Sequence, residues 1–299
     1  MKEKILIIGG TGFFGYHLSK FFSKSYSVTS LSKDKPVKKR KLNNIKYIFG
    51  DISKKKEILF LRKKNFQYVI NCGGYVDHIN AKQTYNNHFI GCKNLVEVFK
   101  TENIKIFIQI GSSAEYGLIR SPQIEKKAGK AKTIYGRSKL KASKFLISQK
   151  KNTFPFVILR FYQLYGPNQD ENRFLPFVIK SCLADKKFPC SDCKQFRDFL
   201  YIDDAVKAVK KCLDNKKTIK EKIINIGYGK PIKLRNVIKM IRQKINKGTP
   251  NYGQIKLRSD ELKKLYPSLG NAKRYLKWGP KINFTKGITK TITYFKKDV

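Results

Sequence analysis

The sequence predicts an α/β fold, a doubly wound parallel sheet with a smaller C-terminal α/β lobe. Residues 5–8 are four consecutive branched apolar residues, typical of a strand that is buried on both faces of a parallel sheet. Glycines follow directly, and residues 13–22 then have the apolar content of a helix. Strands and helices continue to alternate up to residue 160, as right-handed crossovers between parallel strands require.

The turn after the first strand carries regularly spaced glycines, Gly9-x-x-Gly12-x-x-Gly15. Strand, glycine turn and helix together indicate a Rossmann-type dinucleotide-binding unit, although the common spacing is Gly-x-Gly-x-x-Gly. Gly9 permits the tight turn, Gly12 lets a pyrophosphate approach the backbone, and Gly15 lets helix and strand pack closely. Amides at the helix N-terminus would then face the phosphate charge. The other cofactor contacts predicted in this turn are Thr11, Phe13 and Phe14.

The remaining elements are expected in the following order. Strands are predicted at residues 28–32, 45–49, 68–71, 104–110 and 156–159, and helices at 85–100 and 133–149. The lysine-rich segment 33–41 is expected to be a solvated loop. Beyond residue 160 the chain is richer in loops, with helices at 205–213 and 234–245 and a strand at 223–226. We therefore expect a dinucleotide-binding domain at residues 1–165 and a substrate-binding lobe at 166–299, with an approximate boundary that the chain can recross.

The chain is strongly basic, with 65 Lys+Arg against 21 Asp+Glu in 299 residues and a net charge of +44. Such a surface suits nucleic acid, an anionic membrane or a phosphorylated small molecule. The lysines are spread along the whole chain and accompany no nucleic-acid-binding motif, so we expect a charged surface that attracts an anionic substrate and no nucleic-acid partner. The N-terminal apolar run is too short for a signal peptide, and no stretch is long enough to span a membrane. We expect a cytoplasmic protein.

Cys190 and Cys193 are the one Cys-x-x-Cys pair among six cysteines. A closed zinc site needs a second pair, and a thioredoxin-type role needs the pair at a helix start, whereas this pair lies in a polar loop. We therefore expect reduced thiols and no bound metal.

Tyr135 and Lys139 stand four residues apart, on one face of the predicted helix 133–149. A nearby ammonium favours the phenolate, so such a tyrosine can act as an acid or a base near neutral pH. Upstream, Ser112 and Ser113 follow a predicted strand, where a hydroxyl can hydrogen-bond the substrate oxygen on which the tyrosine acts. The combination, in this order behind a glycine-rich strand, indicates hydride-transfer chemistry.

With these motifs the chain resembles the extended short-chain dehydrogenase/reductases, the nucleotide-sugar epimerase/dehydratase group, over essentially its full length. The matching segments are residues 9–15, 50–52, 112–117, 135–139, 159–167, 197–204 and 276–280. The resemblance implies that Asp51 and Ile52 contact the adenine, that Tyr135 is the acid/base and that Lys139 holds the nicotinamide ribose. The resemblance does not decide which serine is catalytic. Counting back from Tyr116-Gly117 selects Ser112, which we prefer, whereas adjacency to Ala114 selects Ser113.

The same resemblance assigns a substrate and its contacts. Arg197 and Arg258 match arginines that hold the phosphates of a sugar nucleotide, a task suited to a bidentate guanidinium. Gln163 stands where the family often has an asparagine in the sugar pocket. The expected partners are a nucleotide-sugar substrate and a second copy of the chain in a homodimer.

Three departures from the family pattern bear on function. The second predicted strand ends in Ser32, followed by Lys33, where NAD-binding members carry an acid; a cation without that acid suits the 2′-phosphate of NADP, so we favour NADP over NAD. His88 stands where an asparagine is common. Glu115 comes one place later than the acidic pair of the dehydratases, which argues against dehydration.

The sequence therefore predicts an NAD(P)-dependent nucleotide-sugar epimerase. The alternative within the family is an NADPH-dependent reductase of nucleotide-linked 4-keto sugars. The alternative outside enzymes is a Rossmann protein that senses the cofactor or binds RNA through its charge.

Overall fold

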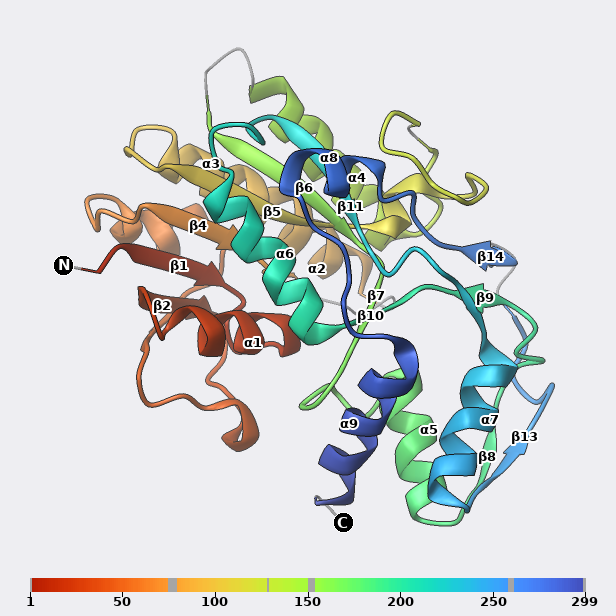
Figure 1. Cartoon of the computed structure of the whole chain (residues 1–299). Coiled ribbons are helices and arrows are strands. Elements are labelled where there is room, and N and C mark those ends of the chain that lie inside the picture. Colours follow the sequence, from red (N-terminus) through yellow and green to blue (C-terminus); the bar gives the residue numbers. More distant parts are fainter. Residues whose placement is uncertain (1, 75–79, 128, 150–153, 258–260, 298–299) are drawn as a thin grey trace.

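A computed structural model of the chain describes residues 2–74, 80–127, 129–149, 154–257 and 261–297 (Figure 1). Seven strands form the central sheet: β1 Lys4–Ile8, β2 Ser27–Ser32, β3 Lys46–Phe49, β4 Tyr68–Asn71, β5 Ile106–Ser112, β6 Phe156–Phe161 and β11 Lys222–Ile226. Their order is β11-β6-β5-β4-β1-β2-β3, and every neighbouring pair is parallel. The doubly wound parallel sheet predicted from the sequence is confirmed.

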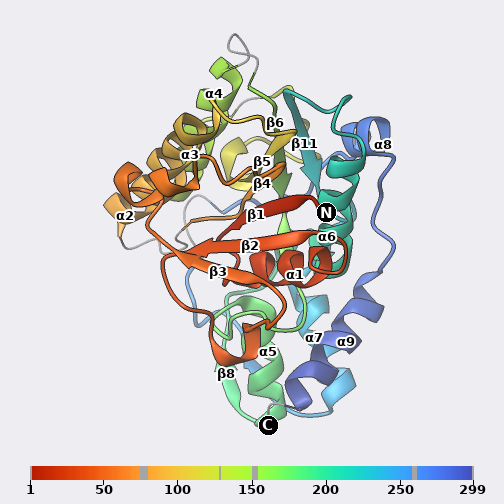
Figure 2. The same cartoon turned by 90° about the vertical axis from the view of Figure 1, so that its left-hand side faces the viewer.

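Both faces of the sheet are covered, because side chains of each buried strand alternate between two cores. In β1, Ile5 and Ile7 belong to one core and Leu6 and Ile8 to the other. The first core is closed by α1 Phe13–Phe22, α6 Ile202–Asp214 and α8 Gly270–Leu276. The second is closed by α3 Gly91–Phe99, α4 Ile134–Ser148 and the 3₁₀-helix η2 Lys55–Leu61. Figure 2 shows these two helical layers on opposite sides of the sheet.

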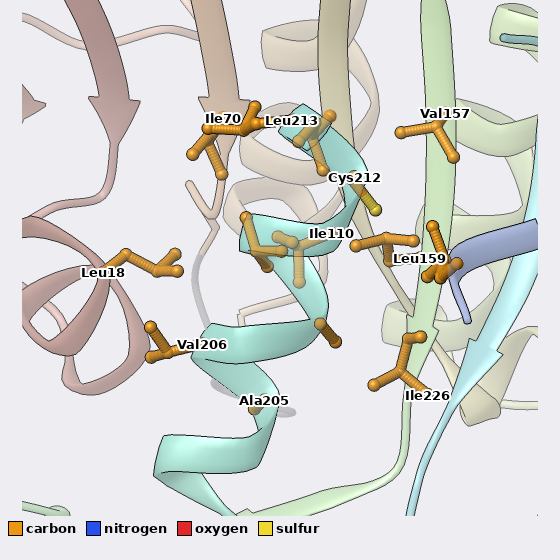
Figure 3. Close-up of a cluster of buried hydrophobic side chains, with 14 of the residues drawn as sticks. Leu18, Ile70, Ile110, Val157, Leu159, Ala205, Val206, Cys212, Leu213 and Ile226 are labelled. Carbon is orange, nitrogen blue, oxygen red and sulfur yellow. The ribbon is translucent and has the colours of Figure 1, made fainter. Parts of the chain in front are cut away.

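Helix α6 packs on the face of the sheet that borders the first core (Figure 3). Its residues Val206 and Leu213 are buried with Leu18 of α1 and with Ile110 and Leu159 of the sheet. Since α6 and β11 both follow residue 166, the chain returns to the sheet after it first leaves it. A division near residue 165 stays a proposal.

The smaller lobe surrounds a third core, to the lower right of the sheet in Figure 1. Its helices are α5 Phe174–Leu183, α7 Leu234–Ile245 and α9 Phe284–Lys296. Its short strands are β7 Gln163–Tyr165, β8 Lys187–Pro189, β9 Phe196–Arg197, β10 Phe199–Tyr201, β12 Ile232–Lys233, β13 Thr249–Asn251 and β14 Lys264–Leu265. No helix in the described ranges is long and apolar enough to cross a membrane.

Two expected segments differ from the structure. The helix predicted at 85–100 consists of α2 Ala81–Tyr85, the π-helical turn η3 Asn86–Ile90 and α3. In the segment 33–41, expected to be solvated, the 3₁₀-helix η1 Lys38–Arg40 ends in a buried arginine. Arg40 donates hydrogen bonds from Nε and Nη2 to the carbonyl of Asn168, at 3.0 and 2.7 Å, so the prediction is wrong at this residue.

The sheet order places a crevice at the carboxyl ends of β1 and β4. In the sheet, β2 lies beside β1 on one side of this pair and β5 lies beside β4 on the other, so the order of the strands reverses between β1 and β4. Doubly wound sheets bind ligands at such a point. The glycine turn after β1 and Gly73 and Gly74 after β4 both lie there.

Candidate active site

The glycine turn has the close packing that the spacing predicted. Gly9 has a φ of +74°, and a Cβ at Gly15 would lie 2.1 Å from the carbonyl oxygen of Gly9. At Gly12 the nearest atom to an added Cβ is 3.4 Å away, so this glycine faces more open space. Gly12 is also the N-cap of α1, and no side chain caps it. This cradle fits a pyrophosphate, which the first amides of α1 would bind.

A cavity of about 310 Å³ extends from this turn along the ends of β1, β2 and β4. It is lined by the predicted cofactor residues Gly9, Thr11, Gly12, Ser32, Lys33, Asp51 and Ile52. The amide of Thr11 donates to Oγ of Ser32 at 3.3 Å, and Oδ1 of Asp51 accepts from the amide and hydroxyl of Ser53 at 2.9 and 2.7 Å. Three further polar side chains line this cavity that were not predicted from the sequence as cofactor contacts: Asp34, Gln83 and Asn87.

Two aromatic residues of the turn take different positions. Phe14 lines the next cavity and packs edge-to-face on Phe161, with ring centroids 5.0 Å apart. Phe13 packs against the lobe core and the ring of His17, 5.3 Å away. The side chain of Phe13 lines neither cavity, so the cofactor contact predicted for this residue stays a prediction for its backbone, at the first residue of α1.

The second cavity, of about 440 Å³, brings Ser112, Tyr135, Lys139 and Gln163 together. Helix α4 supplies Tyr135 and Lys139, and its N-terminus is capped by Thr133, whose Oγ1 accepts the amide of Gly136 at 3.0 Å. Lys139 is buried, and its Nζ donates to the carbonyl of Ile110 at 2.6 Å and lies 6.0 Å from the ring centroid of Tyr135. The ammonium is thus held between the end of β5 and the phenol.

The two candidate serines point into different spaces. Ser112 lines the cavity of Lys139, and its Oγ accepts the amide of Ala114 at 3.2 Å. Ser113 begins the 3₁₀-helix η4 Ser113–Tyr116 and lines an adjacent cavity of about 240 Å³, which Tyr135 also borders. Which serine acts stays a prediction, with Ser112 preferred.

Glu115 is turned away from both cavities. Its Oε2 accepts from Nε of Arg160 at 2.8 Å and from Oγ of Ser143 at 2.7 Å, and its Oε1 accepts the amide of Ser112 at 2.9 Å. The carboxylate therefore ties β5, β6 and α4 together. From its place in the sequence, Glu115 was considered only as a displaced catalytic acid. Its contacts give it a structural role instead.

The 240 Å³ cavity also holds the predicted phosphate contact Arg197, together with Gln163 and Glu261. Nη1 of Arg197 donates to the carbonyls of Phe196 and Leu262, at 2.7 and 2.9 Å, and Nη2 pairs with Glu261. A phosphate at this place would compete with the carboxylate. Arg258, the second predicted phosphate contact, lies outside the described residues.

Further lining residues were missed by the sequence argument. Gln169 and Arg173 line the 440 Å³ cavity from the segment between β7 and α5. Cys72 lines it from the end of β4, and burial raises the pKa of its thiol to about 12, which keeps it protonated and unreactive. Gln163 borders both cavities, so it joins the Tyr135 side to the Arg197 side.

Fold and site together define an enzyme of the extended short-chain dehydrogenase/reductase type, with a dinucleotide cradle beside a Ser-Tyr-Lys cavity. The sequence model of the "NAD dependent epimerase/dehydratase family" matches residues 5–227. The chain belongs to this family. The family is one of NAD-dependent enzymes, so the non-catalytic alternative is set aside.

Individual relatives agree over the full length. The chain is 24% identical to CDP-abequose synthase of Salmonella muenchen, covering 98% of each. The structure of UDP-glucuronic acid 4-epimerase from Bacillus cereus, in complex with UDP-glucuronic acid and NAD, is 25% identical with a TM-score of 0.90, covering 99% of this chain and 100% of that one. The structure of UDP-glucose 4-epimerase from Thermotoga maritima, at 21% identity and a TM-score of 0.92, covers 99% of each chain and shares the fold.

Proposed function

We propose that this enzyme is a nucleotide-sugar epimerase that inverts one carbon of a hexose on a nucleoside diphosphate. The observation that supports this proposal is that Ser112, Tyr135 and Lys139 line one cavity. Gln163 lines both this cavity and the adjacent one, which contains Arg197. A bound nicotinamide would supply reversible hydride acceptance there. Tyr135 takes the proton of the sugar hydroxyl during oxidation and returns it during reduction, while Ser112 holds that oxygen. Lys139 stabilises the phenolate form of Tyr135, which is present before the sugar is oxidised and again after it is reduced.

Two observations argue against loss of water from the sugar. Glu115, the acid nearest the catalytic serine in sequence, is bound by Arg160, Ser143 and the amide of Ser112. No Asp or Glu is among the described residues that line the 440 Å³ cavity. A dehydratase needs an acid at the sugar carbon that loses its hydroxyl, and the described lining of this cavity offers no carboxyl group for that task.

The second candidate is an NADPH-dependent reductase of a nucleotide-linked 4-keto sugar. It is favoured by Lys33, which lines the cofactor cavity beside Ser32 and would attract the 2′-phosphate of NADP. Asp34 lines the same cavity, and its carboxylate favours the ribose hydroxyls of NAD. We keep NADP as the proposed cofactor because Lys33 directly follows the end of β2. The reductase stays the alternative function, and it depends on NADP being the cofactor.

We also propose that residues 1–165 bind the cofactor and 166–299 supply the substrate side, since the described residues that line the 310 Å³ cavity all precede residue 90. The six cysteines are all free thiols, which fits the proposed cytoplasmic location. The proposed homodimer is tested by light scattering, where a mass near the 34.7 kDa of one chain would contradict it.

The deciding experiment combines two measurements on the purified protein. Bound nucleotide is released and identified by mass spectrometry, and a panel of UDP-, CDP- and dTDP-hexoses is followed by NMR without added cofactor. Retained NAD(P) and a redox-neutral change at one sugar carbon support the epimerase. In a separate assay with added NADPH and a nucleotide-linked 4-keto sugar, stoichiometric consumption of the NADPH establishes the reductase. Loss of water from the sugar in the NMR panel overturns both proposals. Tyr135→Phe is the matched control and should turn over the substrate about 10²–10⁴-fold more slowly.

A further inference from the structure

His88 lies in the middle of the π-helical turn η3, where the amide of Gly91 bonds the carbonyl of Asn86, five residues earlier. Turns of this kind inside helices are concentrated at functional sites. The side chain is 3% exposed and lines the 440 Å³ cavity together with Ser112, Tyr135 and Lys139. From the sequence, His88 was expected to stand in place of a common asparagine and to pack a helix against the site.

The imidazole of His88 packs against the ring of Tyr135. The two ring centroids are 5.0 Å apart and the planes meet at 81°, an edge-to-face arrangement. Such pairs are directional, because the positive edge of one ring faces the negative face of the other. The elements that carry the two rings, η3 and α4, pack against each other, so the contact joins two fixed backbones.

The imidazole also lies against backbone at Gly74. A Cβ at Gly74 would lie 1.9 Å from Cε1 and 2.4 Å from Nδ1 of His88. The ring therefore lies directly against the chain that leaves β4. It fills the space between the end of β4 and the phenol.

We propose that His88 is a positioning residue that holds the phenol of Tyr135 toward the reacting sugar carbon. The inference rests on the proposed acid/base role of Tyr135. A tyrosine side chain turns about two bonds, and a proton transfer needs its oxygen within hydrogen-bond reach of the substrate. Because the contact is made by ring packing, a ring at position 88 is sufficient, whereas a small side chain releases the phenol.

The test compares His88→Ala with His88→Phe, using the nucleotide sugar that the wild type turns over. His88→Ala should lower kcat by about three- to tenfold, the size of one aromatic pair expressed as a rate, with cofactor Kd and substrate KM within about twofold. His88→Phe should keep kcat close to that of the wild type and clearly above that of His88→Ala. A wild-type kcat in His88→Ala, a change confined to KM, or equal losses in both variants would overturn the proposal.

A second measurement is independent of turnover. In protein labelled with fluorotyrosine, the fluorine resonance of Tyr135 is assigned by its loss in Tyr135→Phe. His88→Ala should shift that resonance, because a ring neighbour at 5.0 Å is removed, and an unchanged resonance contradicts the packing. If Tyr135→Phe itself keeps the wild-type rate, the proposed function fails, and the resonance still reports whether His88 orients the phenol.

Discussion

Arg160 and Glu115 form a buried ion pair, with Nε 2.8 Å from Oε2 and side-chain exposures of 4% and 0%. The guanidinium also stacks over the ring of Tyr116, 4.6 Å from its centroid. Since Glu115 accepts the amide of Ser112 as well, the pair supports the strand end that carries the preferred catalytic serine. Glu115 and Arg160 therefore have a structural role and take no part in the proposed chemistry.

Replacing Glu115 with glutamine should lower the free energy of unfolding by about 3–5 kcal/mol, because the buried Arg160 loses its counter-charge. Urea unfolding followed by circular dichroism measures it. The control is Asp214→Asn, which breaks the exposed pair between Lys210 and Asp214 and should cost about 0.5 kcal/mol. Equal effects of the two substitutions would contradict the structural role of Glu115.

Tyr135→Phe should reduce kcat by about 10²–10⁴-fold, the usual contribution of a general acid or base. The ring and its contact with His88 are retained, so cofactor Kd should change little. Steady-state kinetics and cofactor fluorescence provide the two values. A variant with the wild-type rate would remove Tyr135 from the mechanism.

Lys33→Glu should weaken NADPH binding by about tenfold more than NADH binding, because the substituted carboxylate repels the 2′-phosphate. Lys33 is exposed, so the difference should shrink as salt is added. Titrations of both cofactors at low and high salt give the comparison. In the matched variant Asp34→Asn the NADPH preference should increase, and a wild type that binds both cofactors equally would leave the NADP proposal without support.

Arg197→Lys should raise KM for the nucleotide sugar by about tenfold while kcat stays within about twofold. Lysine keeps the charge beside Glu261 but loses the planar, bidentate grip on a phosphate. Initial-rate kinetics over a range of substrate concentrations separates the two constants. An unchanged KM would show that the diphosphate does not reach Arg197.

Asp198 should make stability depend on pH. Burial raises the pKa of its carboxyl to about 7, against the effect of the amides of Tyr228 and Gly229, which donate to it. The folded state then binds the proton more tightly than the unfolded state, so this contribution is present at low pH and is lost as pH rises through about 7. Between about pH 5 and 7 the wild type should lose about 1 kcal/mol per pH unit relative to Asp198→Asn. Urea unfolding at several pH values measures this. A difference in the free energy of unfolding between the two proteins that stays constant over this pH range would contradict the raised pKa.

The sequence predicts the parallel sheet well because its signals are local. Helices were expected at residues 13–22 and 234–245, and α1 and α7 have these bounds. The lobe was predicted less well: α5, α9 and the strands of two or three residues were not expected. Such strands exist only through distant partners, as β13 pairs with β8 across some sixty residues, and no local periodicity records that pairing.

The site divides in the same way. Gly9, Tyr135 and Lys139 were found because their spacing within one turn or one helix already expresses the chemistry. Gln83 and Asn87 were missed, although they lie four residues apart, since nothing in their spacing shows that this helix face borders the cofactor cavity. Arg173 was missed because it reaches the cavity from the start of a lobe helix that was not expected.

By itself the sequence determined the sheet, the dinucleotide cradle and the Ser-Tyr-Lys set, because each depends on residues within a few positions of one another. Only the tertiary structure decided where the charges go. Arg40 meets Asn168 from 128 residues away, and Arg197 meets Glu261 from 64. A buried charge is stable only with a partner, and the partner is set by which distant segments the fold brings together, a relationship that no local pattern contains.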